Sequence, residues 1–96
     1  MIQFEQGRLE DICRRHGVMQ LRVFGSASRG EAGPDSDIDL LVDFESPKGF
    51  FELLRLEDEL EAFFGCPVDV VTEPGLSPYL RKPILASATV IFDAAA

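Results

Sequence analysis

Residues 37–44, which read Asp-Ile-Asp-Leu-Leu-Val-Asp-Phe, decide the fold because they form the clearest strand of the sequence. Their side chains alternate in character, and a period of two residues is typical of a β-strand with two different faces. One face carries Ile38, Leu40, Val42 and Phe44, and the other carries Asp37, Asp39, Leu41 and Asp43. The stretch therefore predicts a strand that collects its acidic side chains on one face.

Further elements are predicted on both sides of this strand. Helices are expected over residues 4–16 and 49–64 and from Ser77-Pro78 onward, and strands over residues 18–24, 68–72 and 89–92. Gly17 and Gly65 each follow a helical stretch, where glycine commonly ends a helix. Pro83 falls inside the last helix and is expected to kink it or to delay its start. The order of elements predicts an α+β fold in which helices pack on a small mixed β-sheet.

Apolar side chains spaced by three and four residues predict which side of each helix faces the core. In the first helix they are Leu9, Ile12, Cys13 and His16, of which His16 is interpreted as a capping or surface residue. In the helix over residues 49–64, the shared side consists of Phe50, Leu53, Leu54, Glu57, Leu60, Glu61 and Phe64.

The composition limits the classes of protein to consider. The chain has 96 residues, which suits one domain over residues 1–96, and its hydrophobic fraction of 46% is ordinary for a soluble globular protein. Seventeen acidic against nine basic residues give a net charge of −8, which argues against direct binding to nucleic acid or to an anionic membrane surface. Because no secretory signal or membrane-spanning apolar run is visible, we expect a cytoplasmic protein. Cys13 and Cys66 are expected to be reduced, buried thiols.

Three features carry candidate chemistry, and each has a plain alternative interpretation. Asp37 and Asp39 leave their strand about 6.6 Å apart at Cα, so they either share a divalent cation or face solvent where the strand begins. Gly25-Ser26 follows a strand and either holds phosphate through backbone N–H groups or forms an ordinary turn. Asp69 lies between valines, where a carboxylate needs a metal or a partner unless it stands on an edge strand and faces water.

These features occur in an order that one folded sheet could bring together, and their conjunction favours the chemical interpretation. Asp37 and Asp39 would then hold Mg²⁺, in a site for two ions about 3.5–4 Å apart. Asp69 would bind metal or accept the proton of an attacking hydroxyl.

The spacing of these residues resembles the signature of the minimal nucleotidyltransferases (MNT) of the DNA polymerase β-like superfamily. That signature is Gly-Ser, ten residues and then Asp-x-Asp, and here Gly25-Ser26 is followed by residues 27–36 and by Asp37-Ile38-Asp39. The wider stretches 24–30 and 36–40 are similar to the family as well, and Asp69 stands in the place of its third acid. The likeness covers most of the chain.

The resemblance implies a polymerase β-like core and Mg²⁺-dependent transfer of a nucleoside monophosphate, with release of pyrophosphate. It implies a catalytic and metal-binding cluster made of Asp37, Asp39 and Asp69. It also implies a nucleotide-binding set made of Gly25, Ser26 and Ser36. Arg29 is interpreted either as a further phosphate contact or as a solvated loop residue.

Stand-alone MNT proteins of this size resemble the antitoxin half of two-gene HEPN/MNT systems. The resemblance implies ATP as the donor and a tyrosine of the partner HEPN ribonuclease toxin as the acceptor, whose adenylylation silences the toxin. The acidic balance suits contact with a basic partner. Two alternatives stay open: an antitoxin that neutralises its partner by binding alone, and nucleotidyl transfer to a small molecule or an RNA end. The sequence shows no extra domain to hold a small acceptor and no basic surface for RNA.

Overall fold

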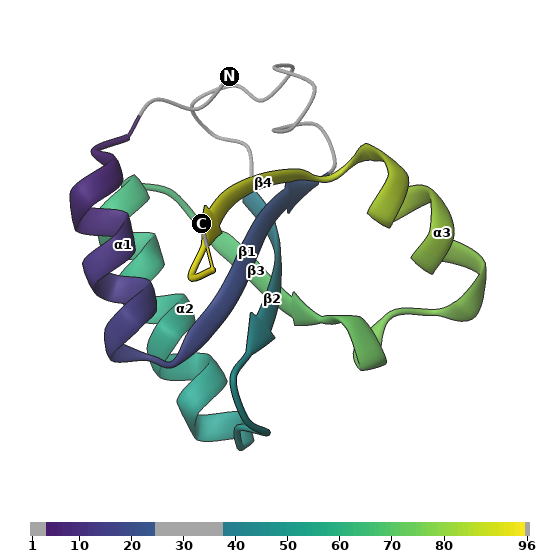
Figure 1. Ribbon diagram of the computed structural model, residues 1–96, viewed down its shortest axis with the longest axis horizontal. Coiled ribbons are helices and arrows are strands. Elements are labelled where there is room, and N and C mark those ends of the chain that lie inside the picture. The colour runs from purple at the N-terminus through teal and green to yellow at the C-terminus, as the bar shows by residue number, and fades with distance from the viewer. Residues whose placement is uncertain (1–3, 25–37, 96) are drawn as a thin grey trace.

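The computed structural model describes residues 4–24 and 38–95 (Figure 1). Their elements in chain order are α1 (Gln6–Arg15), β1 (Val18–Phe24), β2 (Ile38–Phe44), α2 (Phe50–Phe64), β3 (Val68–Thr72), the short 3₁₀ helix η1 (Glu73–Gly75), α3 (Pro78–Ser87) and β4 (Thr89–Asp93). The predicted order of helices and strands is confirmed, as is the α+β fold class.

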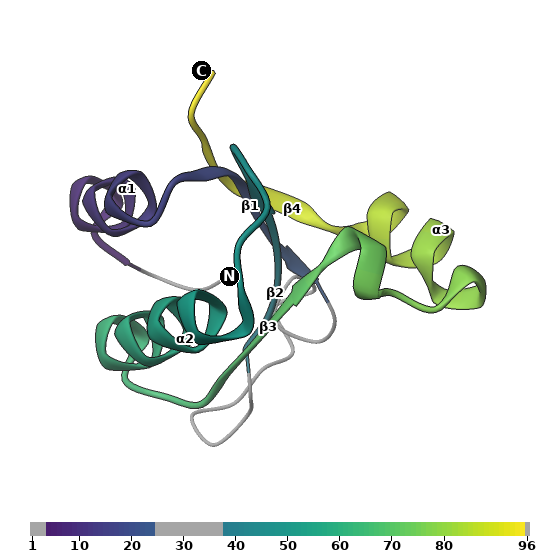
Figure 2. The same ribbon diagram turned by 90° about the horizontal axis from the view of Figure 1, so that it is seen from below.

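The sheet is mixed, with the strand order β3-β2-β1-β4. β1 pairs antiparallel with both β2 and β4, whereas β2 and β3 are parallel. Parallel neighbours need a crossover connection, and α2 supplies it. Figure 2 shows α1 and α2 on one side of the sheet and α3 on the other. We call the sheet face opposite α1 and α2 the open face.

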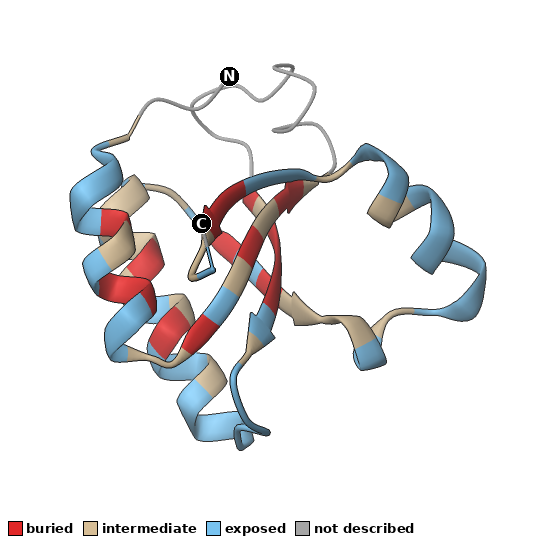
Figure 3. Cartoon of the chain, viewed as in Figure 1, coloured by how far each residue is buried: buried red, intermediate tan, exposed pale blue. Residues whose placement is uncertain are grey.

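The hydrophobic core lies between the sheet and these two helices (Figure 3). Ile38, Leu40 and Val42 of β2 are buried in it, as the alternation of residues 37–44 predicted, and Phe44 packs against its margin. Leu41 is also buried, at 4% exposure, although it belongs to the open face and not to the core cluster. The two faces of β2 are therefore less different than the sequence pattern predicts.

The predicted apolar side of α2 is partly wrong. The buried residues of α2 are Leu56 and Leu60, and Leu56 was not in the predicted set. Phe50 is 69% exposed and Leu54 is 37% exposed, so neither belongs to the core. Leu53, Phe63 and Phe64 pack against the core from its edge, and together with Leu56 and Leu60 they follow helical spacing. The side of α2 that faces the core is therefore rotated around the helix axis from the predicted side, and the first turn of α2 contributes little to the core.

The helix ends follow the predicted chemistry. Gly17 and Gly65 have φ values of 70° and 75°, the left-handed conformation that glycine adopts without strain. The Ser77 hydroxyl accepts a hydrogen bond from the Tyr79 N–H at 3.4 Å, which caps α3. Because α3 begins at Pro78 and continues through Pro83, Pro83 does not delay its start. None of the residues of α3 is buried.

A charged contact joins the two helices that cover the core. Arg15 Nη1 lies 2.9 Å from Glu59 Oε1, and His16 Nε2 lies 3.2 Å from Glu59 Oε2. His16 is the C-cap residue of α1, as expected. Burial alone would raise the pKa of Glu59, but the hydrogen bond and charge of Arg15, with the help of His16, lower it.

Cys13 and Cys66 are both reduced, as expected, but only Cys13 is buried, and Cys66 is partly exposed. Burial raises the pKa of the Cys13 thiol to about 12, so Cys13 serves as a core residue and is a poor nucleophile. Across residues 4–24 and 38–95, none of the helices is long and apolar enough to span a membrane.

The observed core-facing side of α2 predicts which of its side chains stabilise the protein. Leu56→Ala should lower the free energy of unfolding by about 2–5 kcal/mol because it leaves a cavity in the core. Phe51→Ala, at a side chain that is 73% exposed, should change it by less than about 0.5 kcal/mol. Urea unfolding followed by circular dichroism measures both, and equal losses would contradict the observed orientation of α2.

The contact between Glu59 and Arg15 predicts a dependence of stability on pH. The folded-state pKa of Glu59 is below the ordinary value of 4.5, so its contribution is present above pH 4.5 and is lost as the pH falls through the folded-state pKa. Glu59→Gln should therefore destabilise the protein at pH 7, by less than about 1 kcal/mol because the pair is solvent-exposed. The difference from wild type should shrink below pH 4.5 in thermal unfolding, while Asp58→Asn serves as a control on the same helix.

Candidate functional site

Two of the three predicted acids lie side by side on the sheet. Asp39 of β2 and Asp69 of β3 are register partners across the parallel pair. Their strand neighbours Ile38, Leu40 and Val70 are buried in the core, so both carboxylates leave the open face. Asp39 is half-buried and Asp69 is exposed. The structure thus places two carboxylates on adjacent strands, on the face that α1 and α2 leave open.

Two hydrogen bonds at the start of β3 hold this register. The Ile38 N–H donates to the Pro67 carbonyl at 3.0 Å, which joins the first residue of β2 to the residue before β3. The Val68 N–H donates to the Glu61 carboxylate at 3.0 Å, which ties the same point to α2. The crossover through α2 therefore sets the position of Asp69 beside Asp39.

Asp69 lies on an edge strand, and its role with a metal or a proton stays a prediction. β3 stands at the end of the strand order, and Asp69 faces solvent, as an edge strand allows. The same strand is parallel to β2, and this pairing brings Asp69 next to Asp39. Exposure and proximity are compatible here because the open face itself is accessible at this end of the sheet.

The end of β1 lies at the same place. Phe24, the last residue of β1, pairs with Asp39 on the other side of β2. The chain leaves β1 at Phe24 and continues to Gly25, the first residue of the predicted phosphate turn. The strand order therefore sets the entry to this turn and the two carboxylates at one end of the sheet.

The remaining predicted site residues lie outside the described residues, and their roles stay predictions. They are Gly25, Ser26, Arg29, Ser36 and Asp37. Within residues 4–24 and 38–95 no group of three or more His, Cys, Asp or Glu side chains could hold a metal ion. Two carboxylates in register supply the oxygen ligands that a hard divalent cation prefers, and the predicted third member of the cluster, Asp37, precedes β2.

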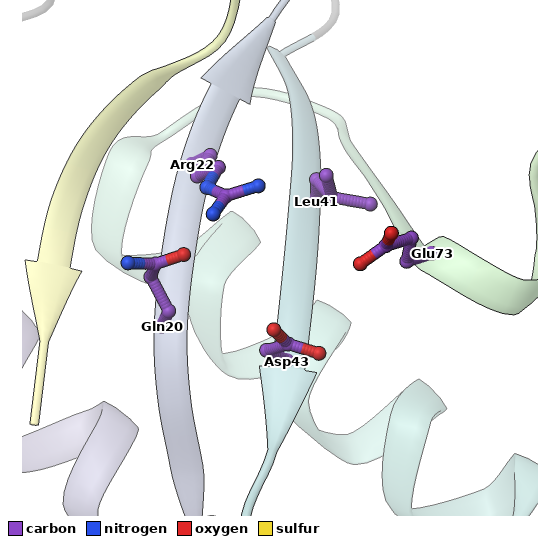
Figure 4. Close-up of a pocket in the computed structure, with 5 residues that line it drawn as sticks. All are labelled: Gln20, Arg22, Leu41, Asp43 and Glu73. Atoms are coloured by element: carbon purple, nitrogen blue, oxygen red, sulfur yellow. The ribbon is translucent and has the colours of Figure 1, made fainter. Parts of the chain in front are cut away.

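A small pocket on the open face was not anticipated from the sequence. It is lined by Gln20, Arg22, Leu41, Asp43 and Glu73, and we call it the open-face pocket (Figure 4). The alternation in β1 and β2 was a usable signal, because residues 20, 22, 41 and 43 share a face with Asp39. The contribution of Glu73 had no such signal, since η1 is a short turn after β3.

Some residues of the open-face pocket already have partners. The Gln20 amide donates to Asp93 Oδ2 at 3.2 Å, and Arg81 Nε donates to Glu73 Oε1 at 3.1 Å. The Arg22 guanidinium makes no hydrogen bond or ion pair with any side chain in the described ranges. Figure 4 shows it extending over the sheet toward Leu41.

Comparison with known proteins places this geometry in a family. The family model described as a nucleotidyltransferase domain matches residues 7–91. The chain is 39% identical over 82 residues to the protein adenylyltransferase MntA of Thermococcus cleftensis, a match that covers 85% of this chain and 83% of the relative.

Solved structures share the fold. One that is described as a minimal nucleotidyltransferase is 45% identical, with a TM-score of 0.77, and the match covers 88% of this chain and 86% of that one. A second is the complex of a tri-AMPylated HEPN toxin of Shewanella oneidensis with an MNT antitoxin, at 17% identity and a TM-score of 0.69 over 94% of this chain and 71% of the matched chain. At that identity the second structure shows the fold alone. The matches over most of its length show that this chain belongs to the nucleotidyltransferase domain family, as a minimal nucleotidyltransferase with the polymerase β-like fold.

Proposed function

We propose that this chain transfers AMP from ATP to a tyrosine hydroxyl of a cognate HEPN ribonuclease toxin and thereby acts as its antitoxin. The observation that carries the proposal is the alignment of Asp39 with Asp69 on the open face. The relative that is 39% identical is a protein adenylyltransferase, which supports a protein as the acceptor. The complex of an AMPylated HEPN toxin with an MNT antitoxin supports the class of partner.

The donor set fits a magnesium site. Asp39 and Asp69 offer carboxylate oxygens from adjacent strands, and Asp69 is open to solvent, so a hydrated ion that also binds phosphate can reach it. We propose that Asp37 completes the set. When bound, the ions would neutralise charge that develops on the transferring phosphoryl group.

The chain's own residues would orient the reactants and move one proton. The tyrosine oxygen forms a bond to the α-phosphorus, the bond from the α-phosphorus to the bridging oxygen breaks, and pyrophosphate leaves in line with the attack. Asp69, which is exposed beside Asp39, would accept the phenol proton. Gly25 and Ser26 would hold the triphosphate where the chain leaves β1, and Arg29 and Ser36 would add contacts to it.

The proposed roles of the three acids predict loss of AMP transfer. Asp37→Asn and Asp39→Asn should reduce labelling of the co-purified HEPN protein by radiolabelled ATP to background, and Asp69→Asn should slow it by about 10²–10⁴-fold as a proton acceptor is lost. Asp58→Asn, an exposed acid of α2, is the matched control and should label at the wild-type rate.

Full activity of the Asp37 and Asp39 variants would refute the proposal. Neutralisation of the toxin that is equally strong with and without ATP would instead favour an antitoxin that acts by binding alone. Circular dichroism spectra of all variants should match the wild type, because Asp39 and Asp69 lie outside the hydrophobic core.

The proposed metal site predicts stabilisation by magnesium. Adding Mg²⁺ with a non-hydrolysable ATP analogue to protein held in EDTA should raise the melting temperature, because a ligand that binds the folded state stabilises it by about 2.7 kcal/mol at a hundred times its Kd. Asp39→Asn should remove most of this increase and Asp58→Asn none of it. An increase of wild-type size in the Asp39 variant would exclude Asp39 as a metal ligand.

A further inference from the structure

The open face carries a cationic side chain to which the proposed reaction gives no role. Arg22 lies on the central strand β1, paired across to Leu41 of β2 and to Val90 of β4. It is half-buried and makes no side-chain hydrogen bond or ion pair within the described ranges. A guanidinium has five N–H donors in a rigid fork, so a half-buried one without a partner has unused capacity to bind oxygen.

The position of Arg22 relative to the carboxylates follows from the register. Phe24, Asp39 and Asp69 form one row across β1, β2 and β3, and Arg22, Leu41 and Val71 form the row two residues away. Two residues along a strand correspond to about 6.6 Å. The chain leaves β1 at Phe24, which belongs to the carboxylate row. Arg22 lies on one side of this row, and the proposed function holds the triphosphate on the other side.

In-line transfer assigns different reactants to these two sides. The attacking oxygen and the leaving pyrophosphate lie on opposite sides of the phosphorus. If the triphosphate extends toward Gly25 and Ser26, as the proposed function requires, the acceptor must approach from the side of Arg22. A tyrosine whose hydroxyl reaches the carboxylate row would then have its backbone over the row of Arg22 and Leu41.

The chemistry of the open-face pocket suits a polypeptide lying across it. The pocket leaves no room for a molecule of the size of water, so its occupant would pass over it and not enter it. Leu41 is the apolar member of the lining; it lies beside Arg22, a donor, and two residues before Asp43, an acceptor, on β2 (Figure 4). Gln20 and Glu73 at the rim are already held by Asp93 and Arg81. A peptide offers both kinds of partner, since every residue carries a carbonyl oxygen and most carry an N–H.

We propose that Arg22 is a positioning residue for the protein substrate, and that it donates hydrogen bonds to a carbonyl or carboxylate oxygen in the segment around the acceptor tyrosine. This inference rests on the proposed transfer to a protein. It adds that the open-face pocket holds the acceptor chain, whereas the nucleotide lies on the other side of Asp39 and Asp69.

The test separates binding of the acceptor from binding of the nucleotide. Arg22→Gln keeps a polar side chain of similar reach on the strand, Arg22→Lys keeps the charge, and Arg55→Gln changes an exposed arginine of α2 on the covered side of the sheet. Each purified variant is assayed for AMP transfer to the co-expressed HEPN protein, for the Kd of that protein without nucleotide, and for the Kd of a non-hydrolysable ATP analogue.

Arg22→Gln should raise the KM and the Kd for the acceptor protein by about 10- to 100-fold, the usual cost of losing hydrogen bonds to a charged group. The kcat and the Kd for the ATP analogue should stay within about twofold, Arg22→Lys should recover part of the loss, and Arg55→Gln should match the wild type. An unchanged acceptor KM, or a weaker affinity for the ATP analogue, would overturn the proposal.

The two hypotheses fail in different ways. If the wild type binds the acceptor protein but transfers no AMP to it, the proposed function is wrong, and a binding loss in Arg22→Gln would still place the acceptor over the pocket. If transfer occurs and Arg22→Gln binds and labels the acceptor like the wild type, the transfer stands and the role of Arg22 is refuted. Melting temperatures of the three variants check that each is folded.

Discussion

The alignment of β2 with β3 is the constraint on which the site depends. A shift of one residue in the register would turn Asp69 toward the core and bring Val68 or Val70 beside Asp39, because side chains alternate between faces. Such a shift would bury a carboxylate and expose valines, so the hydrophobic effect opposes it. The backbone hydrogen bond from Ile38 to Pro67 supports the same alignment, and the bond from Val68 to the Glu61 carboxylate ties the start of β3 to α2. The register that packs the core therefore also sets the positions of the carboxylates.

The parts predicted well from the sequence are those that depend on local periodicity and on glycines that end helices. The alternation of residues 37–44 located β2, the valines around Asp69 indicated β3, and Gly17 and Gly65 marked the ends of helices. The adjacency of Asp39 and Asp69 was conditional on the two strands being neighbours, and α2 between them makes a parallel pair the natural outcome. The roles of Gly25, Ser26 and Asp37 come from the family resemblance and fall outside the described residues.

The parts that sequence reasoning missed depend on how elements pack together. The core-facing side of α2 was predicted wrongly because Phe50 and Leu54 are apolar and suitably spaced. The first turn of the helix, however, lies beyond the edge of the core. Leu41 was set among the acids of its strand, but the long side chains of Arg22 and Glu73 lie beside it (Figure 4). Arg22 looked like an ordinary polar residue of an alternating strand, and only the strand order shows that it stands next to the carboxylate row.

The isolation of α3 has a consequence for local unfolding. This helix of 10 residues has a proline in its interior and buries none of its side chains, and isolated helices of that length are marginal in water. The Ser77 cap and the contact of Arg81 with Glu73 are exposed, so they contribute little to the stability of the helix. Amide hydrogens of α3 should therefore exchange with solvent through openings that leave the sheet intact, as a unit separate from the core. The segment that joins β3 to β4 can lose and regain its helix without disturbing the row of carboxylates.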